Sequence, residues 1–431
     1  MKVLLIDDSS SNPNWGDRAA AFSLKHMILK SGANSITNIT ETELVHSTFH
    51  NKSCEAKYNN SYSRVKETVK MFIPPIVMKV KDKVTSNAPM SIDDDIIPKR
   101  LEDFEKHSRH IFNNRNLYSN LLDTIASSDV IVVHGCELHR NGRDYRSYLF
   151  LIYIAKIHFA KPVIIVNLTV DFLDPEIRQI AEHILPLLDD VVCRDSVSAE
   201  RSKELCNGRF APDTAFIFKA ASPDEWLPVS RRLTYFDVFP DTCQFDPGAP
   251  YICVGGSSIF VYNSQYNPIE GYLQLVEHLM SIYTGQVILT ACCGIDERLF
   301  KPIAAYLKLP LIAFRTPVQQ AVDILGNAQA YVGGRWHGGI FAMTGGSPII
   351  PLSAKTFKML VLAQMAGLPA HMFDALNLAG QKDAIGKQLL CCLEQGDELR
   401  SRLRQWAEDQ SEKCWDNVTY LKNFSERMYC R

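Results

Sequence analysis

Along this chain, short continuous runs of hydrophobic residues alternate with segments in which hydrophobic residues recur at helical spacing. Residues 2–7 form a continuous apolar run that ends in acids, which is typical of a buried parallel strand. Residues 9–17 are rich in turn-forming residues, and residues 18–30 then carry apolar side chains at helical spacing before Gly32. The chain therefore opens with a strand, a loop and a helix. This is the first unit of an open α/β sheet, which gathers ligands at the carboxyl ends of its strands.

The same alternation continues around two irregular stretches. Residues 46–115 are rich in Asn, Lys and Ser, and we expect a polar insertion with some helix there; residues 222–250 are expected to be a linker. Strands are predicted at 129–135, 162–167, 191–194, 251–255, 286–291, 311–314, 330–334 and 347–352, and helices at 145–157, 175–188, 196–206, 269–283, 296–307, 318–327 and 357–367. Because strands and helices alternate, the sheets should be largely parallel.

The pattern thus predicts an α/β protein of two domains. The first covers residues 1–225 and the second residues 250–375, and an amphipathic helical tail follows at 376–431. The loops at the carboxyl ends of the strands should face each other across a cleft, which is the expected site.

Composition narrows the class of protein. Of the 431 residues, 46% are hydrophobic and 22% are charged, which supplies sizeable cores and excludes a disordered chain. The formal net charge of -2 lacks the basic excess of a nucleic-acid binder, although it is compatible with a local basic site for a small anion. No segment reaches the ~20 apolar residues of a membrane span, and the first apolar run is too short for a signal peptide. We therefore expect a cytoplasmic protein.

The cysteines do not indicate a metal centre. The chain has 12 cysteines but no Cys-x-x-Cys spacing, so reduced, buried thiols are expected. His134 and His139 lie near Cys136 and Glu137, but no second cluster supplies the remaining ligands of a zinc site. We expect no metal and no other cofactor.

The sharpest candidate site is Gly-Gly-Arg-Trp-His-Gly-Gly at 333–339, between a predicted strand and a predicted helix. A helix N-terminus favours anions, and Arg335 adds a permanent charge with a fork that fits carboxylate or phosphate. His337 adds a group that can hold or give a proton near neutral pH. From these residues alone, a surface arginine and a structural histidine remain the alternative.

Two other predicted strand ends carry polar residues. Asn14 and Asp17 follow the first strand and are candidates for binding substrate, although a turn with Asp17 as a helix cap is the alternative. Arg194 ends the strand at 191–194, where it can reach an anion or pair with a local acid.

The second half offers two further candidates. Lys355 or Lys358 follows the strand at 347–352 and can contact a phosphate as a point charge, and the residues do not decide which of the two faces the site. Gly256 lies in a Gly-Gly-Ser-Ser turn that can donate N–H groups to an anion, although it is neither a Walker loop nor Gly-x-Gly-x-x-Gly.

In this order the motifs resemble the polysaccharide pyruvyl transferase family over about residues 1–370. The resemblance rests on Asn-Trp-Gly-Asp at 14–17, Cys-Arg-Asp-Ser at 193–196, Ala-Pro-Asp-Thr at 211–214, Gly-Arg-Trp-His-Gly-Gly-Ile-Phe-Ala at 334–342, Gly-Ser-Pro at 346–348 and Lys358. It implies two Rossmann-like domains in a glycosyltransferase-B-like arrangement. It also implies transfer of a pyruvyl group from phosphoenolpyruvate to a sugar of a polysaccharide, a glycan or a lipid-linked precursor, which forms a ketal and releases phosphate.

The resemblance places Arg335 and His337 in the phosphoenolpyruvate site and associates Arg194 with the same anion. The chemistry then makes His337 the general acid that protonates the methylene carbon, while Arg335 and Arg194 bind the carboxylate and the phosphate. Asp17 is expected to bind or deprotonate a sugar hydroxyl. Phosphoenolpyruvate is a donor substrate, so no cofactor is implied.

Three questions stay open from the residues. Relatives often carry Leu where this chain has Trp336, which either stacks on a sugar or packs in the core. A nucleotide-sugar-dependent glycosyltransferase and a non-catalytic glycan-binding relative are the competing functions; Arg335, His337 and Asp17 argue against the second. The acceptor sugar, the ketal position and the oligomeric state are not indicated.

Overall fold

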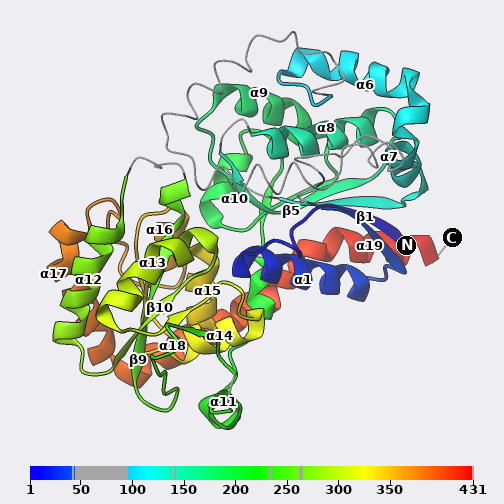
Figure 1. Cartoon of the computed structure of the whole chain (residues 1–431). Helices are drawn as coiled ribbons and strands as arrows, with labels where there is room; N and C mark the ends of the chain where they lie inside the picture. Colours follow the sequence, from blue (N-terminus) through cyan, green and yellow to red (C-terminus); the bar gives the residue numbers. More distant parts are fainter. Residues whose placement is uncertain are drawn as a thin grey trace.

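The computed structural model describes residues 1–40, 43, 96–135, 137–139, 142–232, 235–261 and 266–429. This part of the chain forms two sheets, one in each half, and helices cover both faces of each sheet (Figure 1). The predicted α/β class with two sheets is therefore confirmed. Residues 46–95 of the predicted insertion lie outside the described residues.

The first sheet is parallel. Its strands lie in the order β2 (Ser35–Thr40), β1 (Lys2–Asp8), β3 (Val130–His134), β5 (Val163–Val170), β6 (Asp190–Cys193) and β7 (Arg209–Phe210), and the short β4 (Glu137–Leu138) pairs with the end of β5. Each pair of neighbours is parallel. The carboxyl ends of these strands therefore meet at one edge, as the alternation of apolar runs predicts.

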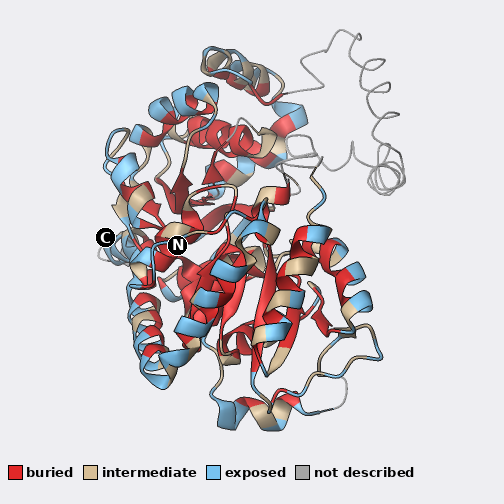
Figure 2. Cartoon of the chain, turned by 90° about the vertical axis from the view of Figure 1, so that its left-hand side faces the viewer, coloured by how far each residue is buried: buried red, intermediate tan, exposed pale blue. Residues whose placement is uncertain are grey.

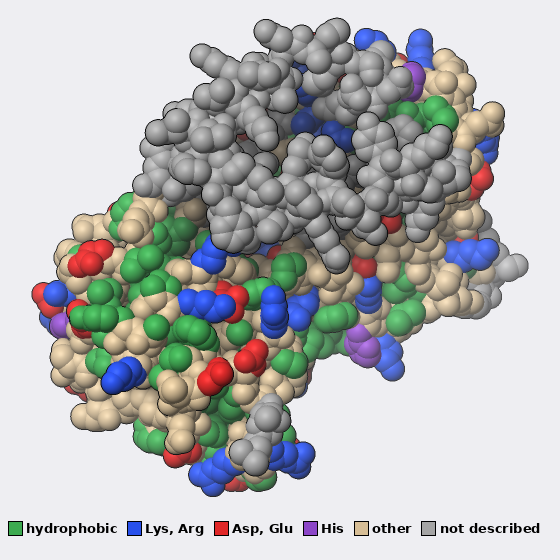
Figure 3. Space-filling model, viewed as in Figure 1, with side chains coloured by type: hydrophobic (Ala, Val, Ile, Leu, Met, Phe, Trp, Pro, Cys, Tyr) green, Lys and Arg blue, Asp and Glu red, His purple; other side chains and the backbone are tan. Residues whose placement is uncertain are grey.

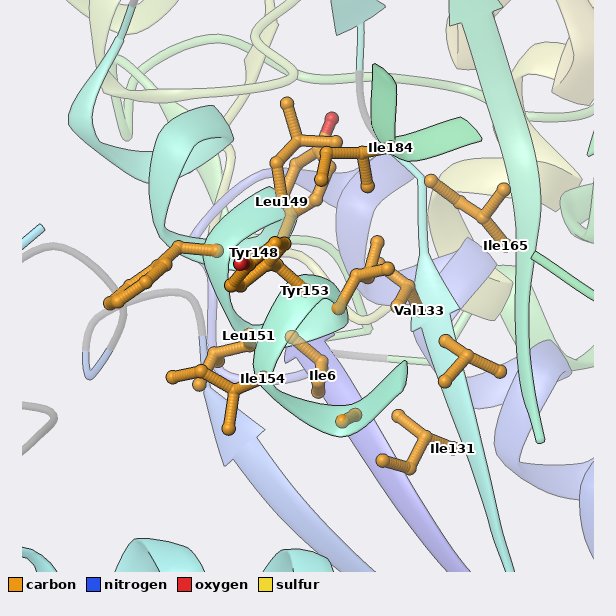
Figure 4. Close-up of a cluster of buried hydrophobic side chains, with 14 of the residues drawn as sticks. Ile6, Ile131, Val133, Tyr148, Leu149, Leu151, Tyr153, Ile154, Ile165 and Ile184 are labelled. Carbon is orange, nitrogen blue, oxygen red and sulfur yellow. The ribbon is translucent and has the colours of Figure 1, made fainter. Parts of the chain in front are cut away.

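Strand β1 buries side chains on both of its faces. Leu4 and Ile6 belong to one core, part of which Figure 4 shows, and Val3 and Leu5 belong to a second core on the opposite face. The first core contains residues of α6 (Phe104–Asn113), α7 (Arg115–Ser127), α8 (Arg143–Ile157), α9 (Pro175–Ile184) and α10 (Ser196–Ser202), and the second contains residues of α1 (Trp15–Lys30) and α19 (Thr419–Tyr429). Double-sided burial explains why these strands are continuous apolar runs.

The described end of the predicted insertion contributes to the first core. Ile97, Phe104 and Ile111 lie within the predicted range 46–115, yet all three are buried in the first core. The many polar residues around them obscure this pattern in the sequence, because α6 buries only one narrow face.

The second sheet is parallel except at one edge. Its order is β13 (Ile349–Pro351), β12 (Tyr331–Gly334), β9 (Tyr251–Ser257), β10 (Gln286–Thr290), β11 (Leu311–Ile312) and β8 (Val238–Phe239), and β8 pairs antiparallel with β11. Helices α12 (Ile269–Ile282), α13 (Gly294–Leu307), α14 (Val318–Asn327), α15 (Trp336–Thr344) and α16 (Lys358–Met365) surround it. Figure 2 shows buried strands beneath helices whose outer faces are exposed.

The linker predicted at 222–250 carries structure that its irregular pattern did not indicate. A helix, α11 (Pro223–Ser230), begins with Ser222 and Glu225 in a reciprocal capping box, and β8 then joins the second sheet. A two-residue edge strand is too short to show a periodic pattern, so sequence reasoning could not find it.

Three C-terminal helices connect the two halves. Helix α17 (Leu378–Glu394) packs against α12, α18 (Gly396–Lys413) packs against α15, and α19 returns to the first sheet, where the two chain ends lie close together (Figure 1). Helix α1 also crosses the boundary: Trp15 packs in a core of the second half, and Arg18 Nη2 donates to the carbonyls of Phe314 and Thr316, each at 3.1 Å. The two halves are therefore extensively joined.

Helices α14 and α15 approach each other through two glycines, which gives a test of this packing. A Cβ on Gly345 would lie 2.2 Å from the carbonyl oxygen of Gly326, which is backbone and cannot rotate away. We expect Gly345→Ala to lower the free energy of unfolding by about 2 kcal/mol or more, as overpacking does. Urea unfolding of the variant measures this.

Gly271 of α12 is the control, because it is also a buried glycine at a helix contact, although it lies inside its helix whereas Gly345 lies just after α15. A Cβ there would meet Tyr266 and Leu378 at 3.6 and 3.7 Å, which is ordinary contact. Gly271→Ala should leave stability unchanged or raise it by up to about 1 kcal/mol, since alanine favours a helix. Equal losses in both variants would contradict the close approach of α14 and α15.

Candidate active site

A cavity of about 230 Å³ lies between the two halves, where loops at the carboxyl ends of strands from both sheets meet. Seven of the eight residues predicted for the site line it: Asn14, Asp17, Arg194, Arg335, Trp336, His337 and Lys358. Gly256 does not. Lys355 also lines the cavity, so both candidate lysines face it. Parallel strands bring these distant segments together, because their carboxyl ends all point to the cleft.

Arg335 is held by a carboxylate of its own half. Its Nε and Nη2 donate to Asp296 at 3.1 and 2.6 Å, a two-pronged contact, and Asp296 also accepts from the backbone N–H of Cys292 at 3.1 Å. Asp296 is completely buried. This pair fixes the direction of the guanidinium as it enters the cavity.

Gly256 supports this pair from outside the cavity. It lies within β9, which extends to Ser257, and a Cβ on Gly256 would stand 2.1 Å from Oδ1 of Asp296. The expected turn therefore begins later than the sequence pattern predicted. The position of Gly256 makes room for the partner of Arg335, and its backbone is not part of the cavity wall.

His337 sits at the N-terminus of α15 and faces the N-terminus of α1. A Cβ on Gly16 would lie 2.0 Å from its Nδ1, so only glycine lets α1 approach the ring this closely. Asn14 caps α1, its Oδ1 accepting from the N–H of Gly16 at 2.9 Å. Asp17 therefore lies in the first turn of α1 and is not its cap, and its carboxylate lines the cavity.

Asp213 joins the two halves through a single carboxylate oxygen. Its Oδ2 accepts from Trp336 Nε1 at 3.0 Å and from Arg194 Nη1 at 3.4 Å, and it lies 3.4 Å from His337 Nε2. Its Oδ1 accepts from the N–H of Ala215 at 2.9 Å. Asp213 comes from the first half, whereas Trp336 and His337 come from the second.

The pKa of Asp213 reflects these contacts. Burial by itself would raise it, but the charge of His337 when protonated and the charge of Arg194 hold the pKa of this carboxyl well below its usual range. Asp213 is therefore ionised at neutral pH, and its charged oxygen faces the imidazole of His337 at 3.4 Å.

Trp336 packs in a hydrophobic core, and little of its side chain is exposed to the cavity. Its side chain is only 3% exposed, its indole N–H is used by Asp213, and the guanidinium of Arg194 lies 5.5 Å from its ring centre. This arrangement favours the packing role that the sequence left open and leaves little ring surface for a sugar.

Arg194 and the two lysines share a second carboxylate, Glu137 of β4. Lys358 Nζ donates to Glu137 Oε1, Lys355 Nζ lies 2.6 Å from Oε2, and Arg194 Nη2 donates to Oε1 at 3.3 Å. Arg194 is also held by Thr169, whose hydroxyl accepts from its Nε at 2.7 Å. Burial lowers the pKa of Lys358 to about 7, and the charges of Arg194 and Arg335 act in the same direction.

His134 is a cavity residue that the sequence suggested only as a doubtful metal ligand. It ends β3, and its Nε2 lies 3.3 Å from Nδ2 of Asn167. Burial lowers its pKa, and the charges of Asp213 and Asp17 oppose this only in part, so the imidazole is neutral at pH 7. His139 instead faces Asp171, with 3.3 Å between Nδ1 and Oδ2, so the two histidines do not share a ligand site.

Comparison with known proteins assigns the family. The sequence model of the family described as polysaccharide pyruvyl transferase matches residues 44–355. The chain belongs to this family. It is accordingly a transferase that acts in polysaccharide pyruvylation in the general sense that the family name carries. The comparison with curated protein sequences found no match.

Solved structures show the fold of this family member. UGT89C1 of Arabidopsis thaliana, solved with quercetin, is 14% identical, with 98% of this chain and 99% of that chain covered and a TM-score of 0.52. The UDP-GlcNAc 2-epimerase of Neisseria meningitidis, solved with UDP-GlcNAc, is 12% identical, with 96% and 99% covered and a TM-score of 0.50. At these identities the likeness shows a shared two-domain arrangement, the glycosyltransferase-B arrangement that the sequence predicted.

Two properties of the described residues concern membranes and metal ions. No helix among them is both long and apolar enough to span a bilayer, and no group of three metal-ligating side chains is arranged to hold an ion. On the face in Figure 3, side chains of opposite charge are interspersed over the described surface.

Sequence reasoning did not assign three carboxylates at the site: Glu137, which lines the cavity, and Asp213 and Asp296, which are buried behind the residues that line it. Asp213 stands inside the Ala-Pro-Asp-Thr motif at 211–214, which was the one available signal for it. Asp296 and Glu137 have no such signal, because their partners lie 39 and 221 residues away in the chain. Together these acids hold every guanidinium and ammonium group of the cavity named above.

Asp213→Asn tests the contact between the two halves. Asn can keep the hydrogen bond from the N–H of Ala215 with its single amide oxygen, but it replaces the charged oxygen that faces Trp336, Arg194 and His337 by an NH2 group. We expect the free energy of unfolding at pH 7 to fall by about 3 kcal/mol. Because the folded-state pKa is lowered, this stability exists above the unfolded-state value of about 4 and is lost as the pH falls below it.

Urea unfolding of both proteins at pH 7 and at lower pH measures this difference, which should shrink in acid. Asp224→Asn is the control, since Asp224 is exposed in the first turn of α11 and should change stability by less than about 0.5 kcal/mol. A difference that does not change with pH would argue against the charge as its cause.

Proposed function

We propose that this protein transfers a pyruvyl group from phosphoenolpyruvate to a sugar of a polysaccharide, glycan or lipid-linked precursor, forming a pyruvate ketal and releasing phosphate. The observation that carries the proposal is the meeting of Arg194, Arg335, Lys355 and Lys358 with His337 in one cavity. Four cations suit a donor with a carboxylate and a phosphate, and the imidazole suits a reaction that begins with a proton.

The size of the cavity favours a small donor. Its volume of about 230 Å³ is below the roughly 300–1,000 Å³ of pockets that enclose drug-sized ligands. Phosphoenolpyruvate is smaller than such ligands, whereas a nucleotide sugar is larger. This observation supports pyruvyl transfer over the nucleotide-sugar-dependent alternative, although the fold is shared with a glycosyltransferase.

In the proposed reaction, His337 gives a proton to the methylene carbon of the donor, and positive charge develops at C2. A sugar hydroxyl attacks C2, the C2–O bond to phosphate then breaks, and a second hydroxyl bonds to C2 and closes the ring. Two hydroxyl protons leave the sugar; one restores the proton of His337 and the other leaves with phosphate, so the atoms balance. Asp213 stabilises the protonated imidazole before transfer, and Arg335 and Arg194 bind the donor's acidic groups.

Asp17 is the proposed contact for the acceptor. It stands on the opposite side of the interface from Arg335, in the first turn of α1, and no ion pair of the described residues occupies its carboxylate. A carboxylate in this place can accept a hydrogen bond from a sugar hydroxyl or take its proton. Cys193 and Cys253 are buried and unpaired, which fits the reducing cytoplasm that we propose as the location.

Donor binding is tested first because it needs no acceptor. Phosphoenolpyruvate at about 100 times its dissociation constant should stabilise the wild type by roughly 2.7 kcal/mol, seen as a higher thermal midpoint. Arg335→Lys should lose this shift, because lysine lacks the guanidinium fork. His337→Gln should keep a shift, but its phosphate release with glycan acceptors should fall at least about 100-fold.

Arg178→Lys is the control for the arginine change, since Arg178 is exposed and pairs with Glu182 on the surface. It should keep the full shift. If nucleotide sugars raise the midpoint and phosphoenolpyruvate does not, the donor is a nucleotide sugar and pyruvyl transfer is rejected. If neither does, the free protein does not bind the proposed donor.

Lys358 gives the binding a pH dependence. Its pKa of about 7 means that the ammonium is lost as the pH rises through neutrality. The affinity for phosphoenolpyruvate should therefore fall between pH 6.5 and pH 8.5, and calorimetric titration measures it. Lys358→Arg keeps its charge over this range and should remove most of that pH dependence; an unchanged profile would assign the dependence to another group.

A further inference from the structure

Glu137 is an acidic residue of the cavity to which the proposed reaction gives no role. Its carboxylate contacts three cations, Lys355, Lys358 and Arg194, and its side chain is only 7% exposed. The two lysines belong to the second half, where Lys358 begins α16 and Lys355 lies in the loop before it, and Glu137 belongs to the first half. A substrate anion entering the cavity would need the same cations.

The contacts of Glu137 differ in kind from those of the other two acids. Asp296 accepts from the backbone N–H of Cys292, and Asp213 accepts from that of Ala215, so each is anchored to the main chain. The hydrogen bonds and ion pairs that the structure gives the Glu137 carboxylate are all with cationic side chains. If the carboxylate of Glu137 moves away, no main-chain N–H group of the described residues loses its acceptor. Only the three cationic side chains lose this partner, and another anion can then pair with them.

The location of Glu137 is also compatible with movement. Strand β4 has two residues and pairs only with the end of β5, outside the main order of the sheet. Asp296, in contrast, lies in the first turn of α13, a 14-residue helix. Moving the carboxylate of Glu137 does not require a central strand or a long helix to move.

We propose that Glu137 occupies, in the free protein, the position of the substrate's phosphate group, and that the phosphate displaces it from the two lysines. Lysines act as point charges toward a phosphate, whereas the fork of Arg335 fits a carboxylate. Glu137 is thus an internal competitor that keeps the lysines paired until an anion enters. The displacement of Glu137 by a phosphate group does not depend on the proposed function. The identification of that phosphate as part of phosphoenolpyruvate does rest on it.

Inorganic phosphate is the probe, measured by calorimetric titration against the full chain at pH 6.5. Glu137→Gln keeps the size of the side chain but removes the competing charge, so the phosphate dissociation constant should fall about tenfold. Glu137→Asp is the second variant: it keeps the charge but withdraws it by one methylene, and it should tighten phosphate binding by a smaller factor. It also serves if Glu137→Gln does not fold.

Asp17→Asn is the matched control, because Asp17 also acts on Lys358 through its charge but makes no ion pair with either lysine. A general gain in positive charge should tighten phosphate binding less than about threefold in this variant. Equal gains in Asp17→Asn and Glu137→Gln, or no gain in either Glu137 variant, would overturn the displacement and leave Glu137 as a fixed counter-ion.

The same titrations with phosphoenolpyruvate separate the two proposals. Tighter phosphate binding by Glu137→Gln together with no phosphoenolpyruvate binding rejects the donor and retains the displacement. Equal binding of phosphoenolpyruvate by the wild type and Glu137→Gln rejects the displacement and retains the donor.

Discussion

A buried cation must be matched by a buried anion, and this constraint organises the centre of the molecule. Asp213 shows it most clearly, because one of its oxygens faces Arg194, Trp336 and His337 and the residue has no exposed surface. An unpaired charge at this depth would cost several kcal/mol. This cost favours an arrangement of the two halves in which Trp336 and His337 of the second half face Asp213 of the first.

The same constraint gives the cavity its chemistry. Each cation is held by an acid in a set direction: Arg335 by Asp296, Arg194 by Asp213, and the lysines by Glu137. A ligand then meets arginines that are already oriented, whereas the lysines are paired with Glu137 until an anion replaces it. The carboxylates also reduce the net positive charge of the cavity, which makes the strength of anion binding depend on which of them stay in place.

Local sequence signals were reliable where chemistry acts over a few residues. The apolar runs predicted the central strands, and polar residues at strand ends predicted seven residues that line the cavity. The errors have physical causes. Asn14 rather than Asp17 caps α1, since either residue type can do so, while Gly256 serves packing because strand β9 runs two residues farther than predicted.

The sequence by itself determined the α/β class, the two sheets and the family, because these depend on periodicity and on short motifs that the chain carries in order. Only the tertiary structure decided that both lysines face the cavity, that Trp336 is buried and that Glu137 and Asp296 are the counter-ions. Such pairs are selected by distance in space and by the cost of leaving a charge unpaired. Neither quantity is visible in residues that stand 39 or 221 positions apart along the chain.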